Sequence, residues 1–164
     1  MKTIKSVVKA RQTRVSGISF CIILIALAIL TPAANAQITV GGNITFNILT
    51  GTAGSQPDPD STPTTTLRYT RQAKICKITV TSTCPTQAFN LQVVATGVTY
   101  GVAAPAVTLI SGMAPVDFIT SIPNSGFTSS TVTLQYTASA TFAQGNSAEM
   151  GNDKHTTTYT LQAQ

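Results

Sequence analysis

Residues 131–142 read Thr-Val-Thr-Leu-Gln-Tyr-Thr-Ala-Ser-Ala-Thr-Phe, and this stretch decides the fold class. Every second residue from Val132 to Phe142 is apolar, and the residues between them are Thr, Gln or Ser. Successive side chains of a β-strand point to opposite faces. A period of two over twelve residues therefore predicts a long antiparallel strand with one buried side and one wet side.

The same alternation recurs on both sides of this stretch. It is clear over 38–48, 89–95 and 159–163, and shorter versions occur near residues 78–80, 107–109 and 116–118. Threonine is the most frequent residue from Gln37 onward, and Glu149 is the only glutamate, so strand formers dominate over helix formers. About seven or eight strands with no helical period between them predict an all-β fold, a single antiparallel β-sandwich. A closed barrel is the alternative, because the same alternation would serve it.

The first 36 residues predict a secretory signal peptide. Basic residues precede an apolar run of 13 residues at 18–30, and Pro32 and Ala34-Asn35-Ala36 follow it. We expect cleavage after Ala36, so that the processed chain is residues 37–164 and begins at Gln37. The alternative, an uncleaved membrane anchor, is disfavoured because spanning hydrocarbon takes roughly 20 apolar residues. The product would be secreted, on the cell surface or in a periplasm, with no stable transmembrane segment.

Removal of this leader changes the charge balance. The chain has 10 Lys+Arg and 5 Asp+Glu, and five of the cations precede residue 15, so the processed chain carries 5 − 5 = 0. A nucleic-acid-binding protein needs surplus cations to displace phosphate counterions, so this class is excluded.

Within the processed chain we expect an N-terminal strand at 37–50, a Pro-, Gly- and Thr-rich segment at 51–65, and the main body at 66–164. The middle segment is either an ordinary mobile loop or a hinge that lets the N-terminal strand leave its own sheet. Cys76 and Cys84 are an even pair in an exported chain, which favours a structural disulfide closed by a turn at Ser82 to Pro85. The alternatives are two free cysteines, an intermolecular pair, or a metal site.

Catalytic chemistry is not indicated. The processed chain has five acidic residues and one histidine, and we find no nucleophile motif, phosphate-binding loop, metal-ligand spacing or cofactor signature. Asp153, Lys154 and His155 are consecutive, and we interpret them as polar residues that open the last strand, unable to face one pocket together. The sequence therefore predicts a protein that is not an enzyme and has no cofactor.

One basic group stands out, because no acidic residue lies between Asp60 and Asp117. It consists of Arg68, Arg71, Lys74 and Lys77. These cations are either a contact for an anionic glycan or an acidic patch of a neighbouring subunit, or they protect an edge strand against unwanted pairing.

The processed chain resembles bacterial surface-fibre subunits, the pilin-like and spore-coat-like group with an immunoglobulin-like sandwich. The residues that carry the resemblance are the alternating start, 37–46, and the alternating end, 157–164, in a low-charge, threonine-rich chain. The resemblance implies that Ile38, Val40, Ile44 and Phe46 form a strand donated to the next subunit, and that Tyr159 and Leu161 lie in the strand held by a chaperone.

Two functions follow as hypotheses. The first is a secreted, non-catalytic structural or adhesive protein that assembles with itself or with other cell-surface proteins by β-strand exchange. The second is a monomeric secreted module that binds a glycan or an exported protein.

Overall fold

A computed structural model describes residues 3–8, 37–145 and 150–164. In these residues it contains eleven strands and one short 3-10 helix. The strands are β1 (Thr3–Val8), β2 (Ile38–Val40), β3 (Asn43–Asn47), β4 (Asp60–Thr70), β5 (Cys76–Thr83), β6 (Asn90–Thr96), β7 (Val102–Ala103), β8 (Val107–Thr108), β9 (Val116–Ile122), β10 (Ser129–Ser139) and β11 (Lys154–Ala163). The helix η1 covers Phe142–Gln144. Among the described residues no helix is long and apolar enough to cross a lipid bilayer.

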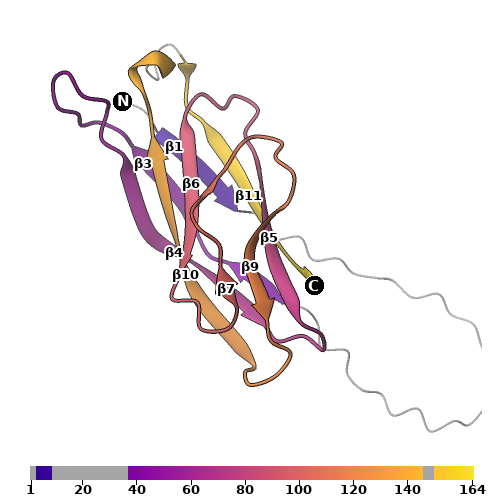
Figure 1. Ribbon diagram of the computed structural model, residues 1–164. Coiled ribbons are helices and arrows are strands. Elements are labelled where there is room, and N and C mark those ends of the chain that lie inside the picture. Colours follow the sequence, from indigo (N-terminus) through magenta and orange to yellow (C-terminus); the bar gives the residue numbers. More distant parts are fainter. Residues whose placement is uncertain (1–2, 9–36, 146–149) are drawn as a thin grey trace, which may run out of the picture.

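The strands form two sheets, which confirms the predicted all-β class. One sheet has the order β3-β1-β11-β5-β9-β7, and the other has the order β2-β4-β10-β6-β8 (Figure 1). All neighbouring strands are antiparallel except β1 and β11, which run parallel. A single cluster of buried apolar side chains receives residues from both sheets, so the two sheets cover one core.

The stretch that decided the fold class forms β10 at the centre of the second sheet. Val132, Leu134, Tyr136 and Ala138 are all buried, and β10 is paired with β4 on one side and β6 on the other. The strand ends at Ser139, earlier than the alternation predicted, and Phe142 is 63% exposed in η1. The side-chain oxygen of Gln144 accepts the backbone N–H of Thr141 at 2.8 Å, which stabilises this turn in place of a further strand residue.

The predicted N-terminal strand is two strands that belong to different sheets. β2 pairs with β4, whereas β3 pairs with β1 in the other sheet. The change of sheet takes place at Gly41 and Gly42, and Gly42 has a φ of 84°, a conformation that side chains other than glycine rarely adopt. The interruption of the alternation at this pair is therefore a corner between the two sheets.

The segment predicted as a loop at 51–65 is shorter than expected, because β4 begins at Asp60 and continues through Pro63. Proline has no N–H to give to a strand ladder. The register between β10 and β4 shifts between Leu134 and Tyr136, opposite Pro63, and such a bulge accommodates the missing donor. The connection from β3 to β4 therefore covers residues 48–59.

One hydrogen bond joins the two sheets inside the core. The hydroxyls of Tyr136 on β10 and Tyr159 on β11 lie 2.8 Å apart, and both side chains are buried. Burial raises the pKa of Tyr136 to about 12 and raises the pKa of Tyr159 well above its ordinary value, so both hydroxyls stay protonated at neutral pH. The ring of Phe118 on β9 packs against Tyr159 with centroids 5.2 Å apart.

The Tyr136→Phe variant should lower the free energy of unfolding by about 1–3 kcal/mol, because it leaves the buried Tyr159 hydroxyl without this partner. The double variant Tyr136→Phe with Tyr159→Phe should recover part of that loss, since it removes both polar groups. Urea denaturation of Tyr136→Phe, Tyr159→Phe and the double variant measures the difference. A double variant whose loss equals the sum of the two single losses would contradict the pairing.

Candidate functional site

The most unusual feature of the fold is the position of β1. This strand, from the basic start of the predicted leader, lies between β3 and β11 (Figure 1). Ser6 is opposite Ile44 on one side and opposite His155 on the other. The rest of the predicted leader and the cleavage position Ala36 lie outside the described residues, and Gln37 is exposed.

β3 and β11 do not pair with each other. Among the described strands, β1 is the only ladder partner of β3. Neighbouring strands are about 4.8 Å apart, so β3 and β11 are separated by roughly twice that distance and cannot exchange backbone hydrogen bonds. We call the place between them the strand slot: it is bordered by Asn43–Asn47 on one side and by residues 154–157 on the other.

The four residues proposed for strand exchange lie against their own chain's core in this structure. Ile44 is 4% exposed and Phe46 is fully buried, and both are on β3. Ile38 and Val40, on β2, are partly buried and lie opposite Tyr69 and Leu67 of β4. The alternation of the segment therefore matches an inward-facing position, the position that a donated strand would occupy in a neighbour.

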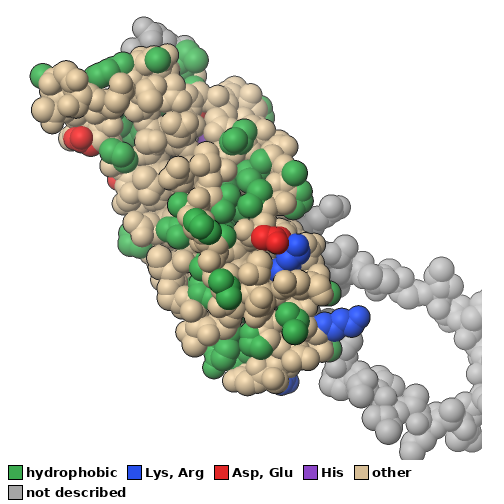
Figure 2. Space-filling view, in the orientation of Figure 1, with side chains coloured by type: hydrophobic (Ala, Val, Ile, Leu, Met, Phe, Trp, Pro, Cys, Tyr) green, Lys and Arg blue, Asp and Glu red, His purple; other side chains and the backbone are tan. Residues whose placement is uncertain are grey.

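The four residues of the basic group do not lie on a single strand. Arg68 is on β4, Arg71 and Lys74 are in the connection to β5, and Lys77 is on β5. The edge-strand interpretation of the group is wrong, because β4 lies between β2 and β10 and β5 lies between β11 and β9. Lys77 forms an ion pair with Asp117 at 2.7 Å, and Arg68 donates to the Ser129 hydroxyl at 3.1 Å. On the face shown in Figure 2, charged side chains are few and hydrophobic ones form separate patches.

The predicted disulfide between Cys76 and Cys84 is absent from the structure. Cys76 begins β5 and Cys84 follows its last residue, so a strand separates them and the chain turns only after Cys84, at Pro85 and Thr86. At about 3.3 Å per residue, eight residues of strand place the two Cα atoms roughly 26 Å apart. A disulfide needs Cα atoms within about 7 Å, so the two cysteines cannot pair within the chain without refolding β5.

Cys84 instead belongs to a buried cluster with Asp153 and His155. One potential ligand atom from each of the three lies within 4.8 Å of the other two. Their side chains are 1%, 1% and 0% exposed, respectively. The β5–β11 register pairs Thr83 with Thr156, and its continuation by one residue places Cys84 opposite His155.

The Asp153 carboxylate fixes the chain that leaves β5. It accepts the backbone N–H groups of Ala88, at 3.1 Å to each oxygen, and of Phe89, at 2.9 Å. These residues precede β6, which lies in the other sheet. A buried carboxylate is stabilised when backbone N–H groups donate to it, so Asp153 ties the start of β11 to the segment that crosses between the sheets.

The His155 imidazole has one partnered nitrogen and one unpartnered nitrogen. Its Nδ1 lies 3.1 Å from the hydroxyl of Ser82, whereas the buried Nε2 has no hydrogen-bond partner. Burial lowers the pKa of His155 below its ordinary value, and the nearby Asp153 carboxylate opposes that shift. The imidazole is therefore neutral at neutral pH.

The sequence did not lead us to expect this cluster, because Asp153, Lys154 and His155 were interpreted as consecutive polar residues that open a strand. Asp153 and His155 are two positions apart, and on an extended chain residues two apart share a face. Only Lys154, between them, is exposed. The two-residue spacing of Asp153 and His155 was visible in the sequence, but their partner Cys84 was assigned to a disulfide.

Because the His155 pKa is lowered, acidification through the ordinary histidine pKa of 6.5 should destabilise the protein. The unfolded chain takes up a proton near the ordinary pKa of 6.5, while the folded imidazole stays neutral, so unfolding becomes more favourable as pH falls. Urea midpoints at several pH values measure this. The chain has one histidine, so His155→Gln is the matched control and should flatten the dependence in this range. An equal slope in the variant would contradict the assignment.

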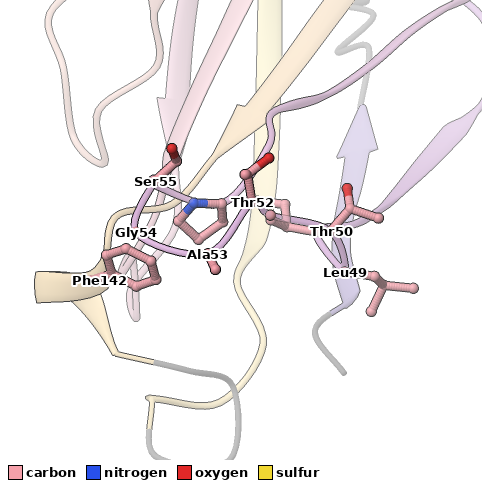
Figure 3. A pocket seen from close by; sticks show the side chains of 10 residues that line it. Leu49, Thr50, Thr52, Ala53, Gly54, Ser55 and Phe142 are labelled. Carbon is pink, nitrogen blue, oxygen red and sulfur yellow. The ribbon is translucent and has the colours of Figure 1, made fainter.

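An open pocket of about 350 Å³ lies between the β3–β4 connection and η1. Figure 3 shows the Phe142 ring close to the Ala53–Gly54 turn, with Leu49 at the opposite end. Its other lining residues are Ile48, Thr50, Gly51, Thr52, Ser55 and Pro57. None of these side chains titrates, so the pocket offers contact area and no acid–base chemistry.

Comparisons of the chain with protein-family models, with curated proteins and with solved structures find no match.

Proposed function

We propose that this chain is a secreted, non-catalytic structural or adhesive protein of the cell surface, whose subunits assemble by β-strand exchange. The observation that carries the proposal is the strand slot: among the described strands, β3 and β11 are joined only through a strand from the predicted leader. In this proposal the leader is cleaved after Ala36 and β1 departs with it. An immunoglobulin-like body that lacks one strand then remains.

Loss of β1 would leave unpaired backbone groups along both borders of the slot. An open edge of this kind is a template for a strand from another chain. A strand that enters pairs with the edge of β11 and covers the core beneath, which is β-augmentation. The filler is then selected by its alternation, with apolar side chains at every second position.

The N-terminal segment of a second copy is the filler that fits best. Ile44 and Phe46 already have the inward alternation, and fully burying such side chains is worth about 1.5–3 kcal/mol each. Loss of β1 also removes the ladder partner of β3, and the connection at 48–59 is long enough to let the segment move. Departure of the leader would thus expose the edge of β11 and free β3 of the same chain, so each copy would offer an edge and donate a strand.

The charge balance supports assembly in the same way. The processed chain has five cations and five anions, so neighbouring copies experience no net repulsion. In the uncleaved chain β1 fills the slot, which would keep subunits apart until export. The leader would then both direct export and prevent assembly before cleavage.

A synthetic peptide of residues 37–48 should bind the processed protein and shorten its assemblies, because it competes for the slot. The matched control is the same peptide with Ile44→Asp and Phe46→Asp, which should bind at least about 100-fold more weakly, since each change places a charge against the core. Because the changes are in the peptide, the protein's own fold is unaffected. Electron microscopy and light scattering measure the assemblies.

Two outcomes would contradict the proposal. The first is equal binding of both peptides, which would show that apolar alternation does not select the filler. The second is a processed protein that stays a compact monomer at high concentration, which would favour the alternative function, a monomeric module that binds a glycan or another exported protein.

A further inference from the structure

We propose that Cys84, Asp153 and His155 form a binding site for a divalent transition-metal ion of the zinc type. The proposal concerns the uncleaved chain, in which Ser6 of β1 lies opposite His155, and it does not require strand exchange. It rests on the geometry of three buried ligand residues and on a buried, unpartnered nitrogen of the His155 imidazole. Such a site would lie where the two sheets are connected.

The ligand spacing is close to that of a tetrahedral site. Zinc bonds of about 2.0–2.3 Å at tetrahedral angles place ligand atoms roughly 3.3–3.8 Å apart. The three candidate atoms lie within 4.8 Å of one another, so the side chains need to approach by about 1.5 Å at most. The backbone already holds Cys84 opposite His155 and holds Asp153 on the same face of the chain.

The orphan Nε2 atom of His155 is the second observation. When Nδ1–H donates to Ser82, Nε2 carries a lone pair that points to no donor, and it does so at 0% exposure. Leaving such a polar atom unsatisfied in a protein interior costs about 1–3 kcal/mol. A metal ion would satisfy it, and a ring nitrogen fixed by a hydrogen bond on its other side is the usual arrangement of a histidine ligand.

The charges of the three ligands also suit a divalent cation. A Cys84 thiolate and the Asp153 carboxylate carry one negative charge each, and the His155 imidazole is neutral, so an M²⁺ ion brings the buried site to zero. One sulfur, one nitrogen and one oxygen favour zinc or a chemically similar ion. Calcium and magnesium are disfavoured, because they prefer a shell of oxygen ligands.

Metal binding would cross-link the fold at one place. The ion would link the end of β5 to the start of β11, and through Asp153 it would reinforce the bonds to Ala88 and Phe89 before β6. This is the kind of cross-link that the sequence had suggested for a disulfide, made by coordination of one of the same cysteines. Three protein ligands leave a fourth position for water or for a group from another molecule.

Cobalt is the probe that tests the site. The full-length chain, purified under reducing conditions and stripped of metal, should bind one Co²⁺ and show a thiolate-to-cobalt charge-transfer band together with tetrahedral d–d bands. Zn²⁺ should displace the cobalt and abolish both sets of bands. Zn²⁺ should also raise the urea midpoint of the same protein.

Single substitutions distinguish the residues that bind the metal from those that do not. Cys84→Ser should lose the charge-transfer band and weaken Co²⁺ binding more than about 100-fold, because removal of a supporting second-shell group alone typically costs 10–100-fold. Cys76→Ser is the matched control, a second buried cysteine at the other end of β5, and it should keep the band. Ser82→Ala should keep the band but bind more weakly, as expected for a positioning residue.

A wild-type protein that binds Co²⁺ without a charge-transfer band would overturn the proposal, as would no binding at all. A band that survives in Cys84→Ser but disappears in Cys76→Ser would also overturn it. If Cys84→Ser does not fold, His155→Gln decides: the proposal requires it to lose high-affinity binding and to change the d–d bands.

Discussion

The whole structure depends on burial of alternate side chains between two sheets. On β10 and β11 every second residue points into the shared core, and the Tyr136–Tyr159 hydrogen bond joins the two strands across it. The Tyr pair is polar, so each hydroxyl is tolerated in the interior because the other is present. This requirement fixes the distance and register between the sheets at one central point, around which the remaining apolar residues pack.

The sequence predicted the parts of the fold that follow from local alternation. β10, β6 and β11 came directly from a period of two, because each buries alternate side chains and leaves those between them more exposed. It could not predict where the chain changes sheets. The Gly41–Gly42 pair looked like an interruption of one strand, and Pro63 looked like part of a loop, because the corner and the bulge depend on strands that are distant in sequence.

In the candidate sites, too, the sequence did not predict which distant segments become neighbours. Sequence reasoning found Cys84 but gave it the wrong partner, since an even cysteine count says nothing about whether a strand separates the thiols. It found Asp153 and His155 but not their shared face. The slot could not be found at all, because the strand that fills it comes from a segment that was set aside as a leader. Each of these errors concerns which elements become neighbours, and no local pattern encodes that information.

The corner at Gly41–Gly42 has a mechanical consequence if subunits exchange their N-terminal arms. The arm carries β2 for one sheet and β3 for the other, so a donated arm would enter both layers of its neighbour. A pulling force along such a fibre would load two ladders in parallel, and they would have to slide together before the joint failed. Peeling would be difficult, because tension on one layer is shared with the other through a two-glycine bend.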